Sequence, residues 1–144
     1  MRRLFFLASL AAGGLCAAPA LADPCKAIPD QGPAPGWLRP GALVSGPVVY
    51  VGDGDSLCVA TGADRSDQAR WVEIRLADFY APELHEPGGR AAKDALERTV
   101  RGKQIACWVE KRSWDRAVAQ CRLGRKSLGD LMRAAGVKEG GNGR

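Results

Sequence analysis

The sequence lacks several features that would place it in well-known classes. It has a single histidine, His85, and no two cysteines in a Cys-x-x-Cys pair, which disfavours a zinc site. The apolar run at its N-terminus is shorter than the roughly 20 residues that a membrane-spanning helix needs. It also has no internal repeat and no block of like charges, so neither a repeat architecture nor a charged tail is indicated. These absences favour a small globular domain.

The N-terminus has the three parts of a secretory signal peptide. An Arg-Arg pair follows the first Met, residues 4–15 are almost wholly apolar, and Ala20 and Ala22 put small residues at the −3 and −1 positions of a cleavage site. We therefore expect residues 1–22 to be removed and the protein to be periplasmic or secreted, with no stable membrane association. An uncleaved anchor is the competing interpretation, and the arginine pair leaves a twin-arginine export route open.

The expected mature chain, residues 23–144, has about the length of one domain. Removal of two arginines with the signal lowers its formal net charge from +5 to +3. This mild basic excess permits an anionic partner such as nucleic acid without requiring one. We expect a Pro/Gly-rich arm over 23–41, one folded domain over 42–138 and a flexible tail over 139–144, in a monomeric protein.

The four cysteines of the mature chain predict two disulfides, because an even number in an exported protein is typical of paired thiols. Cys107 and Cys121 lie in two predicted strands that form a hairpin about Trp114. Antiparallel pairing places the two cysteines directly opposite one another, at a separation that a disulfide can bridge. We therefore predict the pair Cys107–Cys121, which leaves Cys25–Cys58 to tie the arm to the second strand.

Hydrophobic periodicity predicts five strands and two helices. The strands are expected over residues 42–50, 56–61, 71–77, 104–109 and 117–122, and the helices over 91–100 and 128–135. Three strands, a helix, two strands and a helix predict a mainly β, α+β protein: a five-stranded barrel of the OB-fold type with two or three short helices. The loops of that fold commonly hold nucleic acid.

Charged side chains gather where these strands begin or end. They are Asp53, Asp55, Arg75, Asp78, Glu83 and Arg116. The set suits phosphodiester cleavage, because arginine forks neutralise charge on phosphate oxygens and a carboxylate can take a proton from the attacking water. Further carboxylates can hold a hard cation such as Ca²⁺. Each residue by itself is more typical of a turn or a surface ion pair.

Three ordered motifs resemble the thermonuclease family, whose founder is staphylococcal nuclease. The stretch 49–56, VYVGDGDS, matches the family's strand followed by DGD[ST]. The segments 74–76 and 81–83, IRL and APE, match its RL…APE motif, and 114–119, WDRAVA, is similar to its YGR-x-x-A motif. The resemblance runs over residues 48–137 and implies a staphylococcal nuclease-like (SNase-like) fold.

The resemblance implies a role for each matching residue. Asp55 would be a calcium ligand, and Trp114 would stack near a nucleotide. Arg75 and Arg116 would hold the scissile phosphate and stabilise the transition state, and Glu83 would be the general base. The implied activity is metal-dependent hydrolysis of DNA or RNA, with Ca²⁺ as the cofactor.

One departure from the family affects the metal site. The family has a second calcium-binding Asp three residues before its Glu, and this chain has Tyr80 there. A neutral phenol is a poor calcium ligand, so Tyr80 is a candidate for substrate contact instead. Asp78 lies two residues earlier and would be on the same side if the strand continued, so it is the candidate replacement ligand.

Two functions therefore compete at the level of the sequence. The first is an exported metal-dependent nuclease. The second is a catalytically weakened binding module on the same fold, with nucleic acid or protein as its ligand. The two arginines together with Glu83 favour the enzyme, and the missing Asp favours the module.

Overall fold

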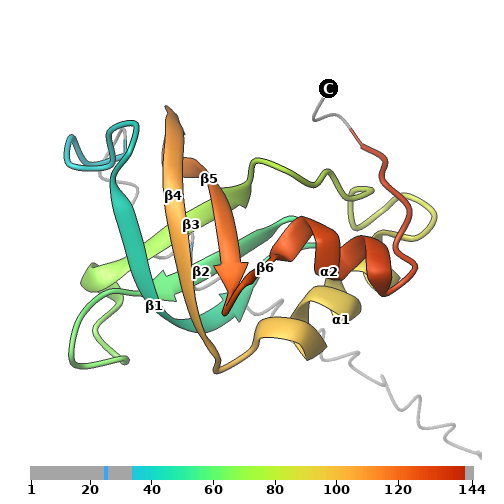
Figure 1. Ribbon diagram of the computed structural model, residues 1–144, viewed down its shortest axis with the longest axis horizontal. Coiled ribbons are helices and arrows are strands. Elements are labelled where there is room, and N and C mark those ends of the chain that lie inside the picture. The colour runs from blue at the N-terminus through green and yellow to red at the C-terminus, as the bar shows by residue number, and fades with distance from the viewer. Residues whose placement is uncertain (1–24, 26–33, 142–144) are drawn as a thin grey trace, which may run out of the picture.

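Five strands close into a barrel, with two helices packed together at one end (Figure 1). The computed structural model describes Cys25 and residues 34–141; the expected signal peptide lies outside the described residues. The strands are β1 (Leu43–Val51), β2 (Ser56–Ala60), β3 (Trp71–Leu76), β4 (Gln104–Ser113), β5 (Arg116–Leu123) and the two-residue β6 (Lys126–Ser127). The helices are α1 (Gly89–Val100), α2 (Leu128–Ala134) and the short 3₁₀ helix η1 (Gln68–Arg70).

The strand order β3-β2-β1-β4-β5 is closed by a pairing between β3 and β5. This pairing is parallel, with Ile74 opposite Ala117 and Leu76 opposite Ala119, whereas every other pairing of named strands is antiparallel. A five-stranded mixed barrel of this kind is consistent with an OB fold. The predicted five-stranded α+β barrel is thus confirmed.

Strand β1 pairs with two different strands along its length. Its first part, 43–47, pairs with β4, and its second part pairs with β2. The register shifts between Val48 and Tyr50, and such a bulge bends a strand. The bend lets one continuous strand turn the corner of a small barrel.

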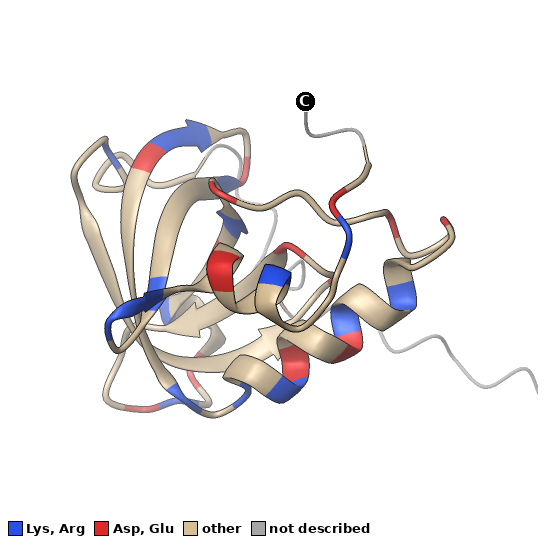
Figure 2. Ribbon diagram, turned by 45° about the vertical axis from the view of Figure 1, so that its right-hand side comes forward, with Lys and Arg blue, Asp and Glu red and all other residues tan. Residues whose placement is uncertain are grey.

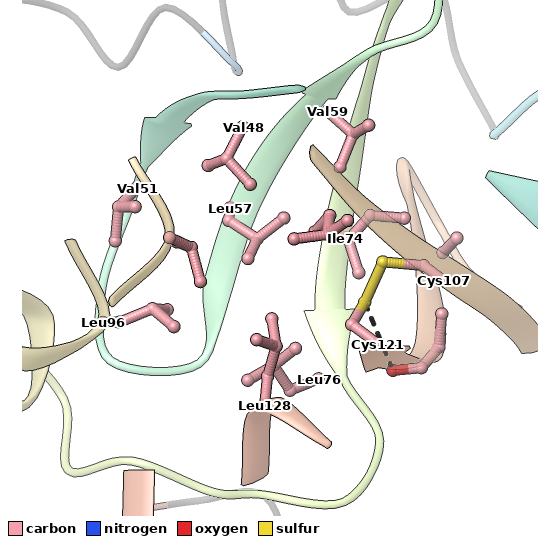
Figure 3. Packing of buried hydrophobic residues seen from close by; sticks show 14 of the residues in the cluster. Val48, Val51, Leu57, Val59, Ile74, Leu76, Leu96, Cys107, Cys121 and Leu128 are labelled. Atoms are coloured by element: carbon pink, nitrogen blue, oxygen red, sulfur yellow. Dashed lines mark hydrogen bonds between the residues drawn. A yellow bond between two sulfur atoms is a disulfide. The ribbon is translucent and has the colours of Figure 1, made fainter. Parts of the chain in front are cut away.

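The barrel interior is filled by aliphatic side chains that alternate along the strands (Figure 3). On β3, Val72, Ile74 and Leu76 point inward, as the alternating pattern predicts. Leu96 from α1 and Leu128 from α2 close one end of the core. Each such side chain is nearly or fully buried, which contributes roughly 1.5–3 kcal/mol per residue to folding.

Both predicted disulfides are present. Cys107 and Cys121 are direct partners in the β4–β5 pairing, with Cα atoms 4.0 Å apart, and their sulfurs lie in the core (Figure 3). Cys25 is joined to Cys58 of β2, with Cα atoms 5.9 Å apart. Among the described residues, the model has no helix of the length and apolarity that crossing a membrane requires.

The β4–β5 hairpin differs from the prediction at its tip. The expected connection over 110–116 is wrong, because β4 continues to Ser113 and β5 begins at Arg116. A bulge between Val109 and Lys111 shifts the register by one residue. Trp114 is the first residue of the two-residue turn and has a φ of 44°. Tight hairpin turns favour a positive φ at this position. The polar, exposed strand ends carry no hydrophobic alternation, so the sequence pattern does not reveal them.

The C-terminal segment contacts the folded domain. Glu139 accepts a hydrogen bond from Arg133 Nε (2.8 Å), and the Gly140 N–H donates to the Tyr80 carbonyl (3.0 Å). Flexibility of the tail over 139–144 stays a prediction. Gly141 has φ +87° and lies so close to the same loop that an added Cβ would strike its backbone. The tail therefore packs on the loop that follows β3.

Replacing both Cys107 and Cys121 by Ala should lower the free energy of unfolding by about 3 kcal/mol, because their bond closes a loop of sequence separation 14 in the unfolded chain. Urea denaturation without reductant measures the loss. Peptide mapping of the variant should still recover the Cys25–Cys58 pair as a control. An unchanged urea midpoint would show that this crosslink does not stabilise the fold.

Candidate functional site

Arg75 and Arg116 lie on the outer face of the barrel, where it closes. Their strand neighbours are buried in the core, so strand alternation turns both arginines outward. Arg75 is registered opposite Val118, two residues beyond Arg116. Strand spacing and rise then put the two arginine Cα atoms about 8 Å apart. Their side chains retain 19% and 26% exposure, so both remain accessible from solvent.

Each arginine faces an acidic partner. Arg75 NH2 lies 3.6 Å from Asp55 Oδ2, and Arg116 NH1 lies 3.8 Å from Glu73 Oε1. Glu73 is only 8% exposed and is a site residue that the sequence reasoning missed. The available signal was its position two residues before Arg75, on the same face of β3. The Cys25–Cys58 bond is anchored next to this pair, because Cys58 is the β2 partner of Glu73.

Asp55 joins the β1–β2 turn to the loop after β3. Its backbone N–H donates to Asp53 Oδ1 (2.9 Å), which fixes the turn. Its buried carboxylate accepts a hydrogen bond from the Ala81 N–H through Oδ2 (2.9 Å). Gly54 allows this close approach, because an added Cβ there would strike the Cβ atoms of Ala81 and Ala92. The DGD motif, residues 53–55, therefore connects the β1–β2 turn to the loop after β3.

Burial raises the pKa of Asp55 to about 6. The nearby Asp53 carboxylate raises it further, while the hydrogen bond from Ala81 and the charge of Arg75 act in the opposite direction. The loss of water around the carboxylate raises the pKa by more than these two contacts lower it. Asp55 is therefore a buried acid that changes protonation just below neutral pH.

Glu83 lies in the loop that Asp55 holds, two residues after Ala81. Its N–H donates to Glu86 Oε2 (2.9 Å), and its carbonyl accepts from the Glu86 N–H (2.8 Å). This turn, followed directly by Gly89 at the start of α1, defines the backbone at Glu83. The structure therefore brings Asp55 and the two arginines together and places Glu83 in the adjoining loop.

Asp78 has a different environment from that expected of a metal ligand. Asp78 would lie on the same side as the site only if strand β3 continued as far as residue 78. Strand β3 ends at Leu76, so this is not the case. Its Oδ2 accepts a hydrogen bond from Ser127 Oγ (2.6 Å), and Ser127 in turn caps α2 through the Asp130 N–H (3.0 Å). Arg133 also donates to the Asp78 carbonyl. These contacts give Asp78 a structural role in docking α2.

The resemblance implies a calcium site that includes Asp55. Within Cys25 and residues 34–141, no group of three or more His, Cys, Asp or Glu side chains could hold a metal ion. Calcium takes six to eight oxygen ligands, and Tyr80 stands where a second carboxylate would supply one. Tyr80 is half-buried, and its carbonyl is bonded to Gly140. The residues described in this structure therefore do not fit the calcium site that the resemblance implies.

Trp114 is the most exposed large apolar side chain of the described chain, at 70%. It stands at the tip of the β4–β5 hairpin, two residues before Arg116, and its carbonyl accepts a hydrogen bond from the Ala34 N–H. This bond ties the arm to the hairpin tip. Stacking of a nucleotide on Trp114 stays a prediction.

A comparison of the chain with models of protein families and with curated proteins yields no match. The likeness to thermonucleases therefore rests on the three motifs and on the placement of their residues.

Asp55→Asn should remove a pH dependence of stability. Because folding raises the pKa of this acid from 3.8 to about 6, its contribution to stability is greatest below pH 3.8 and is lost as the pH rises through 6. Relative to wild type, the variant should gain about 3 kcal/mol between these limits. Urea unfolding at a series of pH values measures this, with Asp94→Asn on the exposed side of α1 as the control. Parallel profiles for Asp55→Asn and wild type would contradict the assignment.

Asp78→Ala should lower the free energy of unfolding by about 1–2 kcal/mol, because Ser127 loses its partner. Ser127→Ala, which removes the same hydrogen bond and the helix cap, should cost at least as much. Neither substitution should change calcium affinity measured by titration calorimetry. A loss of calcium affinity in Asp78→Ala alone would instead make Asp78 a ligand.

Proposed function

We propose that this chain is an exported nuclease that hydrolyses phosphodiester bonds of DNA or RNA. The observation that carries the proposal is the placement of Arg75 and Arg116 on neighbouring parallel strands, with their guanidinium groups partly exposed on one face. Two arginine forks at that spacing suit a single phosphate, since each offers a planar set of N–H donors. The thermonuclease-like order of the motifs supports the same activity.

The reaction can be written with the chain's own residues. A water oxygen attacks phosphorus and forms a new P–O bond, while the bond to the leaving oxygen breaks. Glu83 takes the proton of the attacking water as general base. Arg75 and Arg116 stabilise the negative charge that grows on the phosphate oxygens. The leaving oxygen takes a proton from solvent.

The acidic partners of the arginines orient them for this role. Asp55 and Glu73 each contact their arginine at one nitrogen, and a guanidinium has five N–H donors in all. The remaining donors are available to a phosphate. Because the described carboxylates do not assemble a calcium site, no step of the proposed reaction uses calcium. Whether cleavage depends on calcium is measured in the assay below.

A binding module without catalysis is the second candidate, and a specific observation favours it. Both arginines already have acidic partners, and within the described residues no group of three or more His, Cys, Asp or Glu side chains is arranged to hold a metal ion. Such a site can hold a phosphate without activating water. Basic and acidic residues are also interspersed over the described ribbon rather than separated by sign, which is compatible with moderate binding (Figure 2).

Export is part of the proposal. Its support is the signal-like N-terminus together with two disulfides, which persist in oxidising compartments. A nuclease of broad specificity is also harmless to the genome when it acts outside the cytoplasm.

Glu83→Gln should slow cleavage of single-stranded DNA by about 100-fold or more, because the substitution removes the proton acceptor but keeps the shape of the side chain. The assay compares wild type, Glu83→Gln and Glu97→Gln, the last being a surface acid of α1 that should cleave at the wild-type rate. Each protein is measured with added calcium and with chelator.

The outcomes separate the two candidates. Cleavage that depends on Glu83 supports the enzyme, and its loss with chelator would show that calcium binds despite Tyr80. Binding of DNA by wild type without cleavage would replace the enzyme with the binding module. Absence of both binding and cleavage would overturn both candidates.

A further inference from the structure

Trp108 is a large aromatic side chain on the outer face of β4 that remains 44% exposed. The guanidinium of Arg122 on β5 lies over its ring, 5.9 Å from the centroid. The direct neighbours of Trp108 across the strands are Leu43 on β1 and Gln120 on β5. An exposed indole with a cation over it offers a flat stacking surface beside a positive charge.

A shallow pocket of about 310 Å³ adjoins this ring. Its lining residues are Trp108, Val109, Glu110, Gln120 and Arg122. The Gln120 amide donates to Glu110 Oε1 (2.9 Å), which holds both polar side chains at the pocket wall. An amide and a carboxylate beside an aromatic face can exchange hydrogen bonds with the edge of a stacked base.

The pocket lies on one line with the candidate site. Along β5, Arg116, Val118, Gln120 and Arg122 face outward, alternating with three buried residues. Arg75 of β3 is registered beside Val118. The row therefore runs from the two site arginines to Arg122, over six residues of strand or about 20 Å.

Basic residues mark the far end of this row. Beyond Arg122, the turn at the end of β5 carries Arg125 and is followed by Lys126 of β6, both exposed. Three cations stand here against the single carboxylate of Glu110, which favours an anionic ligand. An apolar peptide would gain nothing from this charge, whereas a polynucleotide backbone would.

We propose that the Trp108–Arg122 pocket is a second subsite for single-stranded nucleic acid. One base stacks on Trp108, whose partner Gln120 lies four residues, or about 13 Å, along β5 from Arg116 of the phosphate site. The inference rests on the proposed function and extends it, because it makes the substrate an extended single strand. Stacking on aromatic side chains and a positive track are the usual means of binding such strands, and an OB fold covers about 4–16 nucleotides. A duplex would not present an unstacked base to the indole.

The test uses phosphorothioate single-stranded DNA, which resists hydrolysis, in a fluorescence anisotropy assay at low salt. One probe has about 12 nucleotides, within the span of an OB fold, and the other is a dinucleotide that reaches only the arginine site. Trp108→Ala should weaken binding of the long probe about 5- to 100-fold and leave the dinucleotide unaffected. Trp108→Phe should retain most of the affinity, because it keeps an aromatic face.

Trp37→Ala is the matched control, since Trp37 is 50% exposed and is not among the residues that line the pocket. The proposal is overturned if Trp108→Ala binds the long probe as wild type does, or if both tryptophan variants lose affinity equally. It is also overturned if Trp108→Ala weakens the dinucleotide as much as the long probe. If wild type binds neither probe, the proposed function fails, and this subsite with it.

Discussion

The parallel pairing of β3 with β5 is the constraint on which the rest of the structure depends. Residues 74–76 and 117–119 are far apart in the sequence, and their pairing closes the barrel and buries the inward faces of both strands. The same register fixes Arg75 and Arg116 as diagonal neighbours on the outer face and sets Glu73 opposite Arg116. A shift of one residue would turn every one of these side chains to the other face. The register of β3 with β5 therefore determines both the core and the candidate site.

A second constraint is the buried carboxylate of Asp55, which holds the β1–β2 turn to the loop that carries Glu83. Burial of this acid costs stability at neutral pH, as its raised pKa shows. The loop is further held by the Ser127–Asp78 bond and by the contact of Gly140 with Tyr80. Helix α2 and the C-terminal segment thus support the site loop in addition to Asp55. This arrangement favours a pre-formed site over one that assembles when ligand binds.

Much of the fold could be predicted, because it depends on local pattern. Inward alternation on β3 follows from Val72, Ile74 and Leu76, and opposing hairpin positions identify the Cys107–Cys121 bond. The face of Glu73 could be predicted from its position two residues before Arg75, but its partner Arg116, more than 40 positions away in the sequence, could not. The same holds for Asp78, whose contact with Ser127 exists only once α2 packs against β5 and meets the loop after β3. The contacts of the C-terminal segment could not be predicted either, because Gly140 and Gly141 meet Pro82 and Ala81 only in the folded structure.

The sequence by itself determined the five-stranded α+β barrel, the pairing of its cysteines and the identity of the two outward arginines. These follow from side-chain periodicity, turn residues and opposing strand positions, all of which act over short stretches of chain. Only the tertiary structure decided which acids face those arginines and where β3 ends, and that no three acids of the described residues group as metal ligands. Such properties depend on distances between segments remote in sequence, and these distances are set when the barrel closes. The same closure places Arg75 beside the outward row of β5 that leads to Arg122 and the Trp108 pocket.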